Sequence, residues 1–367
     1  MSTDGEPVSF PLRRTCPFAL PAEYARLRDE DPVPRAVLPT GRTTRLVTRH
    51  ADVREALSHP LVSPDRNRPG FPLPAAFPPE TLRKLNLSLL GMDPPGHTWL
   101  RRLVISEFTH KRMKALRPHV QAIVDRCVDD VLASGPPVDL VQALSLPVPS
   151  LTVCELLGVP YADHEFFQSR ATTMVNRDAD LTERTRANAE FVSYVDGLVT
   201  DKEPAPPDDL IGRLINRMRA ADRYDHETVV ALARLLLIAG HESTANMISL
   251  SAVALLEHPE LLTELENEPD LAPRAVEELL RFFSVSDVVT ARAVLDDIEI
   301  GGVTIRRDEG LIALTAAANR DEAVFDSPDR LDFHRDSRSH LAFGFGVHQC
   351  LGQNLARVEL EVVLTTL

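Results

Sequence analysis

The sequence has few cysteines, no long apolar run and no secretory leader. Its four cysteines, Cys16, Cys127, Cys154 and Cys350, are far apart, and without a Cys-x-x-Cys pair they indicate neither a disulfide framework nor a zinc ribbon. No stretch approaches 18 uninterrupted apolar residues, so no transmembrane helix is expected. The first ten residues include acids and lack an apolar core, which argues against a signal peptide. These absences together predict a cytoplasmic protein.

Positive charge is also scarce. The chain carries 40 Lys and Arg against 54 Asp and Glu, a formal net charge of −14. Nucleic acids and anionic membranes attract dense Lys and Arg clusters, so neither is expected as a partner. The 367 residues are 44% hydrophobic and 26% charged, which is typical of a globular protein with a sizeable core.

The apolar pattern predicts a mainly α fold with small β-sheets near its ends. Helices are expected at about 97–109, 112–133, 148–157, 163–174, 183–201, 208–220, 226–257, 259–266 and 270–283. Thr43–Thr48 has strand character, Asp52–Leu57 is expected as a short helix, and Asp297–Ile305 alternates around two glycines as a tight hairpin would. No linker is visible, so a single domain over residues 1–367 is expected.

A proline-rich segment, 63–80, interrupts the first hundred residues. Proline there excludes a central strand or a helix interior. A long irregular segment of this kind is either a binding lid or a surface linker, and the residues do not decide between the two.

The strongest chemical signal is FGFGVHQCLG, residues 343–352. Its glycines permit a tight turn, and the helical pattern that follows places Cys350 near a helix N-terminus, where a thiolate is favoured. A thiolate held in this way suits the axial position of a haem iron, although a lone cysteine is more often a buried hydrophobe. The spacing Phe-x-x-Gly-x-x-x-Cys-x-Gly is more specific: about three chance matches are expected in ten thousand such sequences.

This loop resembles the haem-binding loop of the cytochrome P450 family in its soluble bacterial form. The resemblance extends from the Cys16-Pro-Phe region to the end, and it is closest to actinobacterial hydroxylases of macrolides, polyenes, sterol-like molecules and xenobiotics. It implies the cytochrome P450 fold, with haem b between the long central helix and the helix after Cys350. It also implies that the Cys350 thiolate binds the iron and that Phe343, Gly344 and Gly352 form the loop around the haem.

The segment from His226 to Glu257 predicts one helix of 32 residues, about 48 Å long. Asp225 is a suitable N-cap and Pro259 a stop. Its middle, AGHEST, places polar residues inside an apolar run. Glycine costs roughly 1 kcal/mol in a helix interior, so Gly240 is expected to serve close packing or ligand access.

Helical spacing places Leu235, Ala239, Glu242 or Ser243, and Asn246 on one face, and the Ser243 hydroxyl is able to bond the Ala239 carbonyl. Without the cysteine loop, a kinked core helix with Glu242 facing solvent is favoured.

The resemblance instead implies an oxygen-binding groove. Ala239 and Gly240 would line the haem, and Glu242, Ser243 and Thr244 would be the catalytic residues. Ser243 stands where the family most often has threonine. The lost β-branch predicts a more mobile proton donor.

Two further sets of residues match the family. Glu278 and Arg281 form an i,i+3 pair, which by itself is a common surface feature. The resemblance implies a structural network of this pair with Arg330. It also implies haem propionate contacts for His97, Arg101, Arg292 and His348, and propionates do require cationic or hydrogen-bonding partners.

The implied function is that of a haem-thiolate monooxygenase, which uses O2 to hydroxylate or epoxidise a small hydrophobic molecule. No flavin-like segment is seen, so electrons are expected from a ferredoxin and its NAD(P)H-dependent reductase. Either a docking patch for the ferredoxin or a solvated face is formed by Arg102, Arg112 and Arg357. The protein is expected to be a monomer.

Substrate contacts are implied for residues 65–90 and 165–180 and for Leu235, Ala239, Val288 and Val289. Because the chain ends at Leu367, inside the helix after Cys350, the usual C-terminal segment of the family is expected to be lacking. Two other classes stay open: a non-catalytic P450-like helper of a partner enzyme, and a thiol or metal protein using His348 and Cys350 without haem.

Overall fold

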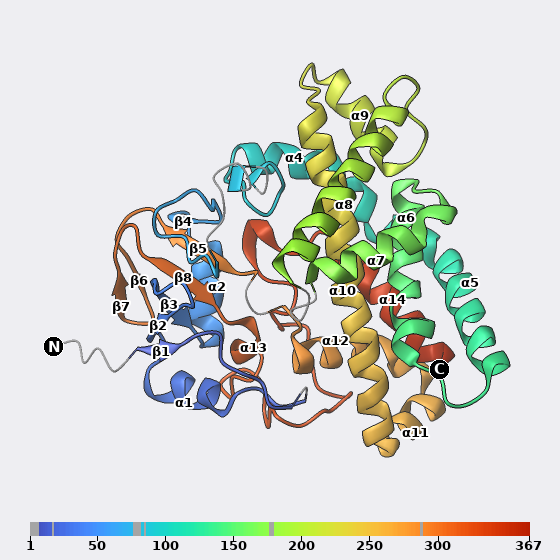
Figure 1. Cartoon of the computed structure of the whole chain (residues 1–367). Helices are drawn as coiled ribbons and strands as arrows, with labels where there is room; N and C mark the ends of the chain where they lie inside the picture. Colours follow the sequence, from blue (N-terminus) through green and yellow to red (C-terminus); the bar gives the residue numbers. More distant parts are fainter. Residues whose placement is uncertain (1–6, 17, 76–81, 84–85, 176–179, 287–288) are drawn as a thin grey trace. The chain divides into compact units, whose positions relative to one another are not determined.

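The computed structural model describes residues 7–16, 18–75, 82–83, 86–175, 180–286 and 289–367. It divides into two compact units, each built from segments far apart in the sequence (Figure 1). The sheet unit comprises Met1–Thr98 and Pro273–Cys350, and the helical unit comprises Trp99–Ala272 and Leu351–Leu367. The chain therefore passes between the units three times, which explains why composition reveals no linker.

The sheet unit contains a mixed sheet with the order β1-β2-β3-β8-β5-β4. The strands are β1 (Val8–Ser9), β2 (Arg35–Val37), β3 (Thr43–Val47), β4 (Val62–Ser63), β5 (Ala291–Val294) and β8 (Gly310–Ala313). β3 was expected and is confirmed. It pairs in parallel with β8, with Leu46 opposite Ile312, so strands from both ends of the chain form one sheet.

The expected hairpin is also confirmed. β6 (Ile298–Ile300) and β7 (Val303–Ile305) pair antiparallel, with Ile300 opposite Val303. Gly301 and Gly302 have φ values of +59° and +77°. Glycine reaches this left-handed region without steric cost, so the tight turn follows from the sequence.

Two apolar layers cover the larger sheet. Neighbouring residues of β3 point to opposite faces: Leu46 packs in one buried cluster and Val47 in the other. The helices of this unit are α1 (Ala22–Glu30), α2 (His50–Ser58), α13 (Thr315–Ala318) and nearly all of α12 (Ala272–Phe283). α2 contacts β3, β4 and β8, so it holds the segment before the proline-rich stretch against the sheet.

The helical unit agrees closely with the expected pattern. Its helices are α5 (His110–Ser134), α6 (Pro147–Leu157), α7 (His164–Val175), α8 (Leu181–Lys202), α9 (Leu210–Ala220), α10 (His226–Glu257), α11 (Pro259–Asn267) and α14 (Gln353–Thr366). α4 (Gly96–Val104) begins in the sheet unit and continues as a 3₁₀ turn, Ile105–Phe108. Shorter turns are Val141–Ser145 (π), Tyr161–Asp163 and Pro269–Leu271.

α10 is the central helix of the helical unit. It begins where Asp225 accepts a hydrogen bond from the Thr228 amide at 2.9 Å, and it ends before Pro259, as both residues predicted. α6, α8, α9 and α14 all contact it. Among the described residues, no helix combines the length and apolar character needed to cross a membrane.

Candidate active site

The cysteine loop is a closed backbone turn in the sheet unit. The Cys350 amide donates to the Phe343 carbonyl at 2.8 Å. Gly346, at φ +74°, begins a 3₁₀ turn to His348. A Cβ at Gly346 would lie 2.7 Å from the Leu57 carbonyl oxygen, so a side chain there would clash with the backbone of α2. The loop ends in an exposed thiol at Cys350, and α14 begins three residues later at Gln353.

Side chains of the same unit hold this loop. The Arg54 guanidinium lies over the Phe345 ring at 4.5 Å, and the rings of His340 and Phe343 are 5.6 Å apart. The Leu341 amide donates to Asn319 Oδ1 at 2.7 Å. These contacts fix the backbone on the N-terminal side of the cysteine.

Glu278 and Arg281 are fully buried and form the centre of a network. Arg281 Nε and Nη2 each donate to a Glu278 carboxylate oxygen at 2.7 Å. Arg281 also donates to the Asn319 carbonyl at 2.9 Å. Because Asn319 in turn accepts from Leu341, the buried ion pair and the cysteine loop share one hydrogen-bonded chain, as the resemblance implied.

The third arginine of this network was assigned wrongly from the sequence. Arg330 is exposed, and only its backbone carbonyl accepts from Arg281, at 3.3 Å. The guanidinium that reaches Glu278 is that of Arg335, at 3.2 Å. Arg335 lies two residues before Ser337, whose hydroxyl also donates to Glu278, at 2.5 Å. Sequence spacing alone does not distinguish two arginines in one irregular segment.

Three of the expected propionate contacts belong to the sheet unit. The rings of His97 and His348 lie 4.1 Å apart, and the His97 amide donates to the Asp93 carbonyl at 3.0 Å. Arg292 is buried on β5, and burial, followed by the charge of Arg66, lowers its pKa to about 10. The fourth contact, Arg101, follows His97 by one turn on α4.

The residues around Cys350 suit a metal ion that takes its remaining ligands from a bound cofactor. Cys127 and Cys154 are buried, and burial raises their thiol pKa values, that of Cys154 to about 12. Cys350 is the exposed cysteine. The described residues contain no group of three or more His, Cys, Asp and Glu that would hold a metal ion. A single thiolate beside histidines and arginines suits an iron macrocycle with carboxylate substituents.

The second set of predicted residues lies on α10. Ala239 and Asn246 are exposed, and Leu235, Glu242 and Ser243 are partly exposed, so the predicted face is confirmed. The Ser243 hydroxyl donates to the Ala239 carbonyl at 2.9 Å, as predicted, although α10 continues without a break.

Gly240 packs against α6. A Cβ at this position would lie 3.3 Å from a methyl group of Val153, which supports the expected packing role. Thr244, by contrast, is 4% exposed. Of the two adjacent hydroxyls, only that of Ser243 lies on the exposed face.

Glu242 is not simply directed to solvent. Its side chain is 20% exposed, and Oε1 accepts a hydrogen bond from the Thr172 hydroxyl of α7 at 3.4 Å. Burial raises the pKa of Glu242, and the Thr172 bond partly opposes that shift. Burial also lowers the pKa of His241 to about 4, so the neighbouring imidazole is neutral at pH 7. Thr172 lies in the expected 165–180 region, but no motif singled it out as a partner of Glu242.

The predicted substrate residues are only partly described. Val289 is exposed and Leu235 is partly buried, whereas Val288 lies outside the described residues. The expected 65–90 and 165–180 regions also include positions outside them, 76–81, 84–85 and 176–179.

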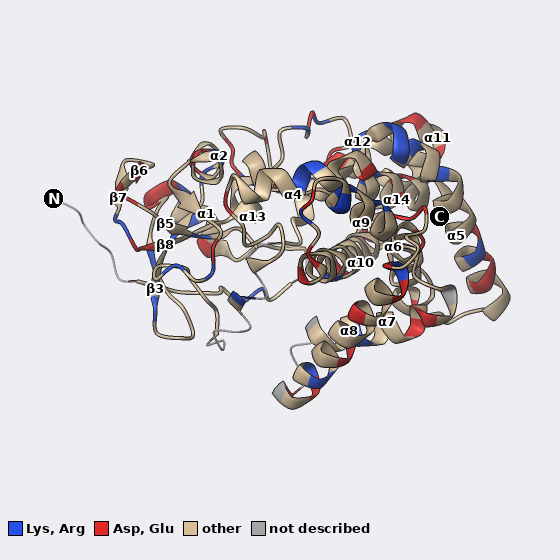
Figure 2. Ribbon diagram, turned by 90° about the horizontal axis from the view of Figure 1, so that it is seen from above, with Lys and Arg blue, Asp and Glu red and all other residues tan. Residues whose placement is uncertain are grey.

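The three arginines suggested for docking differ in their surroundings. Arg112 donates to Glu107, whose carboxylate is fully buried, at 2.8 Å. Arg357 donates to Gln353 on its own helix. Arg102 is exposed. Figure 2 shows acidic and basic positions mixed on the same helices, for example along α8. Because Arg112 and Arg357 are engaged in these hydrogen bonds, the exposed Arg102 is the member of the trio most open to a partner.

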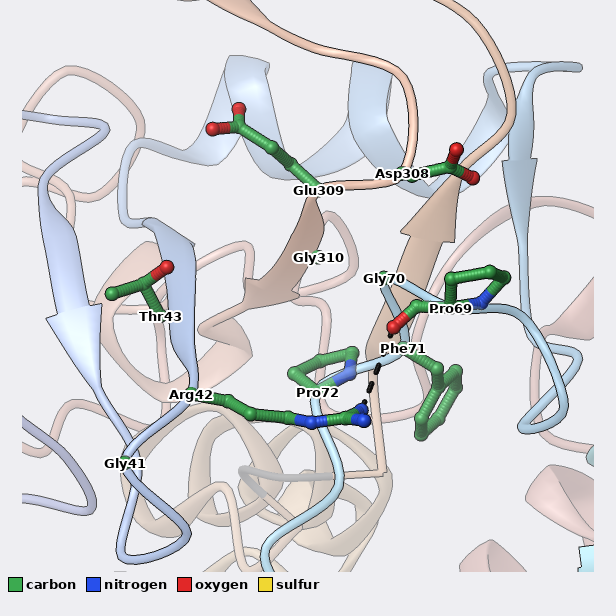
Figure 3. Close-up of a pocket in the computed structure, with 10 residues that line it drawn as sticks. All are labelled: Gly41, Arg42, Thr43, Pro69, Gly70, Phe71, Pro72, Asp308, Glu309 and Gly310. Atoms are coloured by element: carbon green, nitrogen blue, oxygen red, sulfur yellow. Dashed lines mark hydrogen bonds between the residues drawn. The ribbon is translucent and has the colours of Figure 1, made fainter.

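A pocket of about 400 Å³ opens in the sheet unit, away from these residues in the sequence (Figure 3). It is lined by Gly41, Arg42, Thr43, Pro69, Gly70, Phe71, Pro72, Asp308, Glu309 and Gly310. Arg42 donates to the Pro69 carbonyl across it at 3.5 Å. Residues 69–72 of this lining belong to the expected 65–90 substrate region, whereas none of the individually predicted site residues lines the pocket.

Comparison with known proteins defines the family. The family model described as Cytochrome P450 matches residues 165–367. Cytochrome P450 105A3 of Streptomyces carbophilus is 48% identical over the whole chain and 89% of its own length. The crystal structure of cytochrome P450 MoxA from Nonomuraea recticatena superposes with a TM-score of 0.90 at 52% identity, covering 98% of this chain and 90% of that one.

A third neighbour carries a bound molecule. The mycinamicin VIII C21 methyl hydroxylase MycCI of Micromonospora griseorubida, bound to mycinamicin VIII, has a TM-score of 0.91 at 42% identity, with 98% and 90% coverage. The chain belongs to the cytochrome P450 family and is a P450 monooxygenase. The family implies haem with a cysteine thiolate ligand, and O2 as the oxidant.

Proposed function

We propose that this chain hydroxylates or epoxidises a hydrophobic secondary metabolite, with the Cys350 thiolate as the iron ligand. The observation that carries the proposal is the exposed Cys350 thiol at the end of a turn closed by the Phe343 carbonyl. The backbone bond and the glycines hold the sulfur in one place, and the start of α14 favours its anionic form. The haem, when bound, supplies O2 activation and the oxidising power.

The polar residues of α10 have the task of proton delivery. Glu242, partly buried and with a raised pKa, holds a proton closer to neutral pH than an exposed glutamate does. Ser243 lies next to it on the same face, and its hydroxyl relays a proton when it leaves the Ala239 carbonyl. Leu235 and Ala239 supply apolar contacts for the substrate on that face.

The substrate class is proposed from the neighbours. MycCI was crystallised with mycinamicin VIII, so macrolides are the first class to test, before polyenes, sterol-like molecules and xenobiotics. A ferredoxin with its NAD(P)H-dependent reductase is proposed as the electron source, approaching near Arg102. Binding of a candidate substrate is measured as the spin-state shift of the haem spectrum.

The deciding experiment is the spectrum of the reduced protein with carbon monoxide. The wild type is expected to give the strongly red-shifted Soret band of thiolate-ligated haem, and Cys350→Ala is expected to lose it. Cys154→Ala, which removes a buried thiol, is the control and keeps the band. Haem without the shift in the wild type would contradict thiolate ligation. Failure to bind haem would favour the helper role over the enzyme.

A further inference from the structure

Arg66 is a partly buried arginine in the expected 65–90 substrate region, and it is not among the residues expected to bind the haem. Its backbone amide donates to Asn86 Oδ1 at 3.3 Å, and its guanidinium carbon lies 5.7 Å from the centre of the Phe71 ring. Nη1 is buried and makes no hydrogen bond within the described part of the chain. Burial lowers the pKa of this side chain. A buried guanidinium nitrogen without an acceptor is costly unless a ligand supplies one.

A second buried arginine lies beside it. β4 pairs antiparallel with β5, with Ser63 opposite Ala293, so Arg66 follows the paired end of β4 by three residues and Arg292 is next to the paired residue of β5. Arg292 is 8% exposed and donates from Nη1 to the carbonyls of Val289 and Ala291. The Arg66 charge lowers the pKa of Arg292, whereas Asp93 opposes that shift. Two like charges therefore share one buried region.

The nearby carboxylates are already engaged. Asp93 accepts the Ser63 hydroxyl at 2.6 Å. Asp65 Oδ1 accepts from Asn67 and Asn86, and its Oδ2 lies 3.5 Å from Arg68 Nε. Within the described residues, neither carboxylate forms a hydrogen bond or close ion pair with Arg66 or Arg292. Within the described residues, Arg66 Nη1 is thus left without an acceptor, and the charge of Arg292 acts in the same region.

The same cluster continues to the histidine pair. Asp93, which faces Arg292 electrostatically, also accepts the backbone amide of His97, and the His97 ring lies 4.1 Å from that of His348. Asp93 therefore links Arg292, through its charge, with the histidine pair, through its backbone carbonyl, within the sheet unit.

We propose that Arg66 and Arg292 together bind one carboxylate of the haem, which makes Arg66 a further cofactor-binding residue. The inference rests on the proposed haem site. A substrate carboxylate has the same chemistry, and the experiment distinguishes the two sources.

The test is the rate of haem transfer from the full-length holoprotein to an excess of apomyoglobin. Arg66→Gln is compared with Arg68→Gln, an exposed arginine two residues away that pairs with Asp65. Loss of a hydrogen bond to a charged group predicts about tenfold faster haem loss for Arg66→Gln. Arg68→Gln is expected to match the wild type, and Arg66→Lys to be intermediate.

Reconstitution with haem dimethyl ester, which has no free carboxylates, provides the second arm. The ester is expected to dissociate from the wild type and from Arg66→Gln at the same rate. Equal acceleration for haem and ester, or equal rates for Arg66→Gln and Arg68→Gln, would overturn the proposal. Unchanged haem loss with weaker binding of carboxylate-bearing substrates would assign the anion to the substrate. The wild-type carbon monoxide spectrum tests the haem site itself independently of all these variants.

Discussion

Glu242 and Ser243 are neighbours in the sequence, but their side chains are held in different ways. Ser243 bonds back to its own helix, whereas Glu242 bonds to Thr172 on α7. A serine hydroxyl has three χ1 rotamers of similar energy, and it leaves the Ala239 carbonyl more readily than a β-branched threonine does. At the scale of single residues, proton delivery thus depends on one mobile and one anchored group.

Replacement of Ser243 is predicted to uncouple the enzyme. Ser243→Ala should raise the fraction of electrons lost as hydrogen peroxide several-fold, because the relay hydroxyl is gone, and Ser243→Thr should lower it below the wild-type value. The measurement is peroxide released per NAD(P)H consumed. Ser249→Ala removes the same kind of bond, to the Ala245 carbonyl, one turn and a half further along α10. Equal uncoupling in that control would contradict the role of Ser243.

Replacement of Thr172 is predicted to change the pH dependence of substrate oxidation. The Thr172 hydroxyl stabilises the ionised Glu242 and so lowers its pKa. Thr172→Val removes that bond, so the pKa of Glu242 should rise further. The alkaline limb of the activity–pH profile, which reports the ionisation of Glu242, should then move to higher pH. Thr173→Val, whose hydroxyl bonds the Ser169 carbonyl, is the matched control. A profile identical in both variants would remove Thr172 from the proton path.

At the scale of elements, irregular segments are fixed by buried charges. The segment between β8 and the cysteine loop has few helical or strand residues, and its course is set by Glu278, which accepts from Arg281, Arg335, Ser337 and the Asp332 amide. Glu278 and Arg281 are fully buried, so each lost partner leaves charge uncompensated in a low-dielectric interior.

Two arginines of this segment provide a matched pair. Arg335→Gln is predicted to lower the free energy of unfolding by about 2 kcal/mol, because it removes a bond to a buried carboxylate. Arg330→Gln, at an exposed side chain, is predicted to change it by less than about 0.5 kcal/mol. Denaturant unfolding followed by circular dichroism measures both. A larger loss of stability for Arg330→Gln than for Arg335→Gln would support Arg330 as the third arginine of the network, as assigned from the sequence.

The junction of α8 and α10 contains a pH-sensitive cluster. His226, the first residue of α10, contacts Glu203 at 2.5 Å and Asp196 at 3.0 Å, and Glu203 also accepts from Tyr224. Arg219 lies near it and donates to the Glu203 carbonyl. The two carboxylates raise the pKa of His226 above 6.5 and outweigh the opposing effect of burial.

The stabilisation by His226 is therefore predicted to depend on pH. Its folded-state pKa is raised, so the contribution is complete below the unfolded value of 6.5 and is lost as pH rises through the folded pKa. His226→Gln should cost up to about 1 kcal/mol at pH 6 and much less at pH 9. Unfolding curves at the two pH values measure the difference. His258→Gln, at an exposed histidine near Glu260, is the control.

At the scale of the whole molecule, the chain is acidic, whereas the expected docking site for the electron donor is basic. The chain carries a net charge of −14. Glu107 forms ion pairs not only with Arg112 but also with Arg213 and Arg217, at 2.8 and 2.6 Å. These arginines stabilise the helical unit, and the exposed Arg102 remains for a partner.

Reversal of the charge at Arg102 is predicted to weaken docking of the electron donor. Arg102→Glu should raise the KM for ferredoxin several-fold at low ionic strength, and the effect should fade at high salt, where exposed charges are screened. Arg126→Glu, at an exposed arginine of α5, is the control and should leave KM unchanged. An equal effect of both variants would point to net charge instead of a local site.

Local sequence patterns were sufficient to predict the elements and the chemistry of the central motifs. Helical periodicity and its caps predicted α10 residue by residue, because Asp225 and Pro259 act within one turn of chain. Adjacent glycines predicted the β6–β7 hairpin, and the spacing around Cys350 predicted the closed loop.

Contacts between residues far apart in the chain became known from the folded structure alone. β3 pairs with β8 across more than 260 residues, Arg335 and not Arg330 reaches Glu278, and Thr172 bonds Glu242 across 70 residues. The pairing of β4 with β5 brings together the segments that carry Arg66 and Arg292. Such partners depend on packing between segments remote in the chain, whereas periodicity and capping act within a few residues, so a local pattern contains the elements but not their contacts.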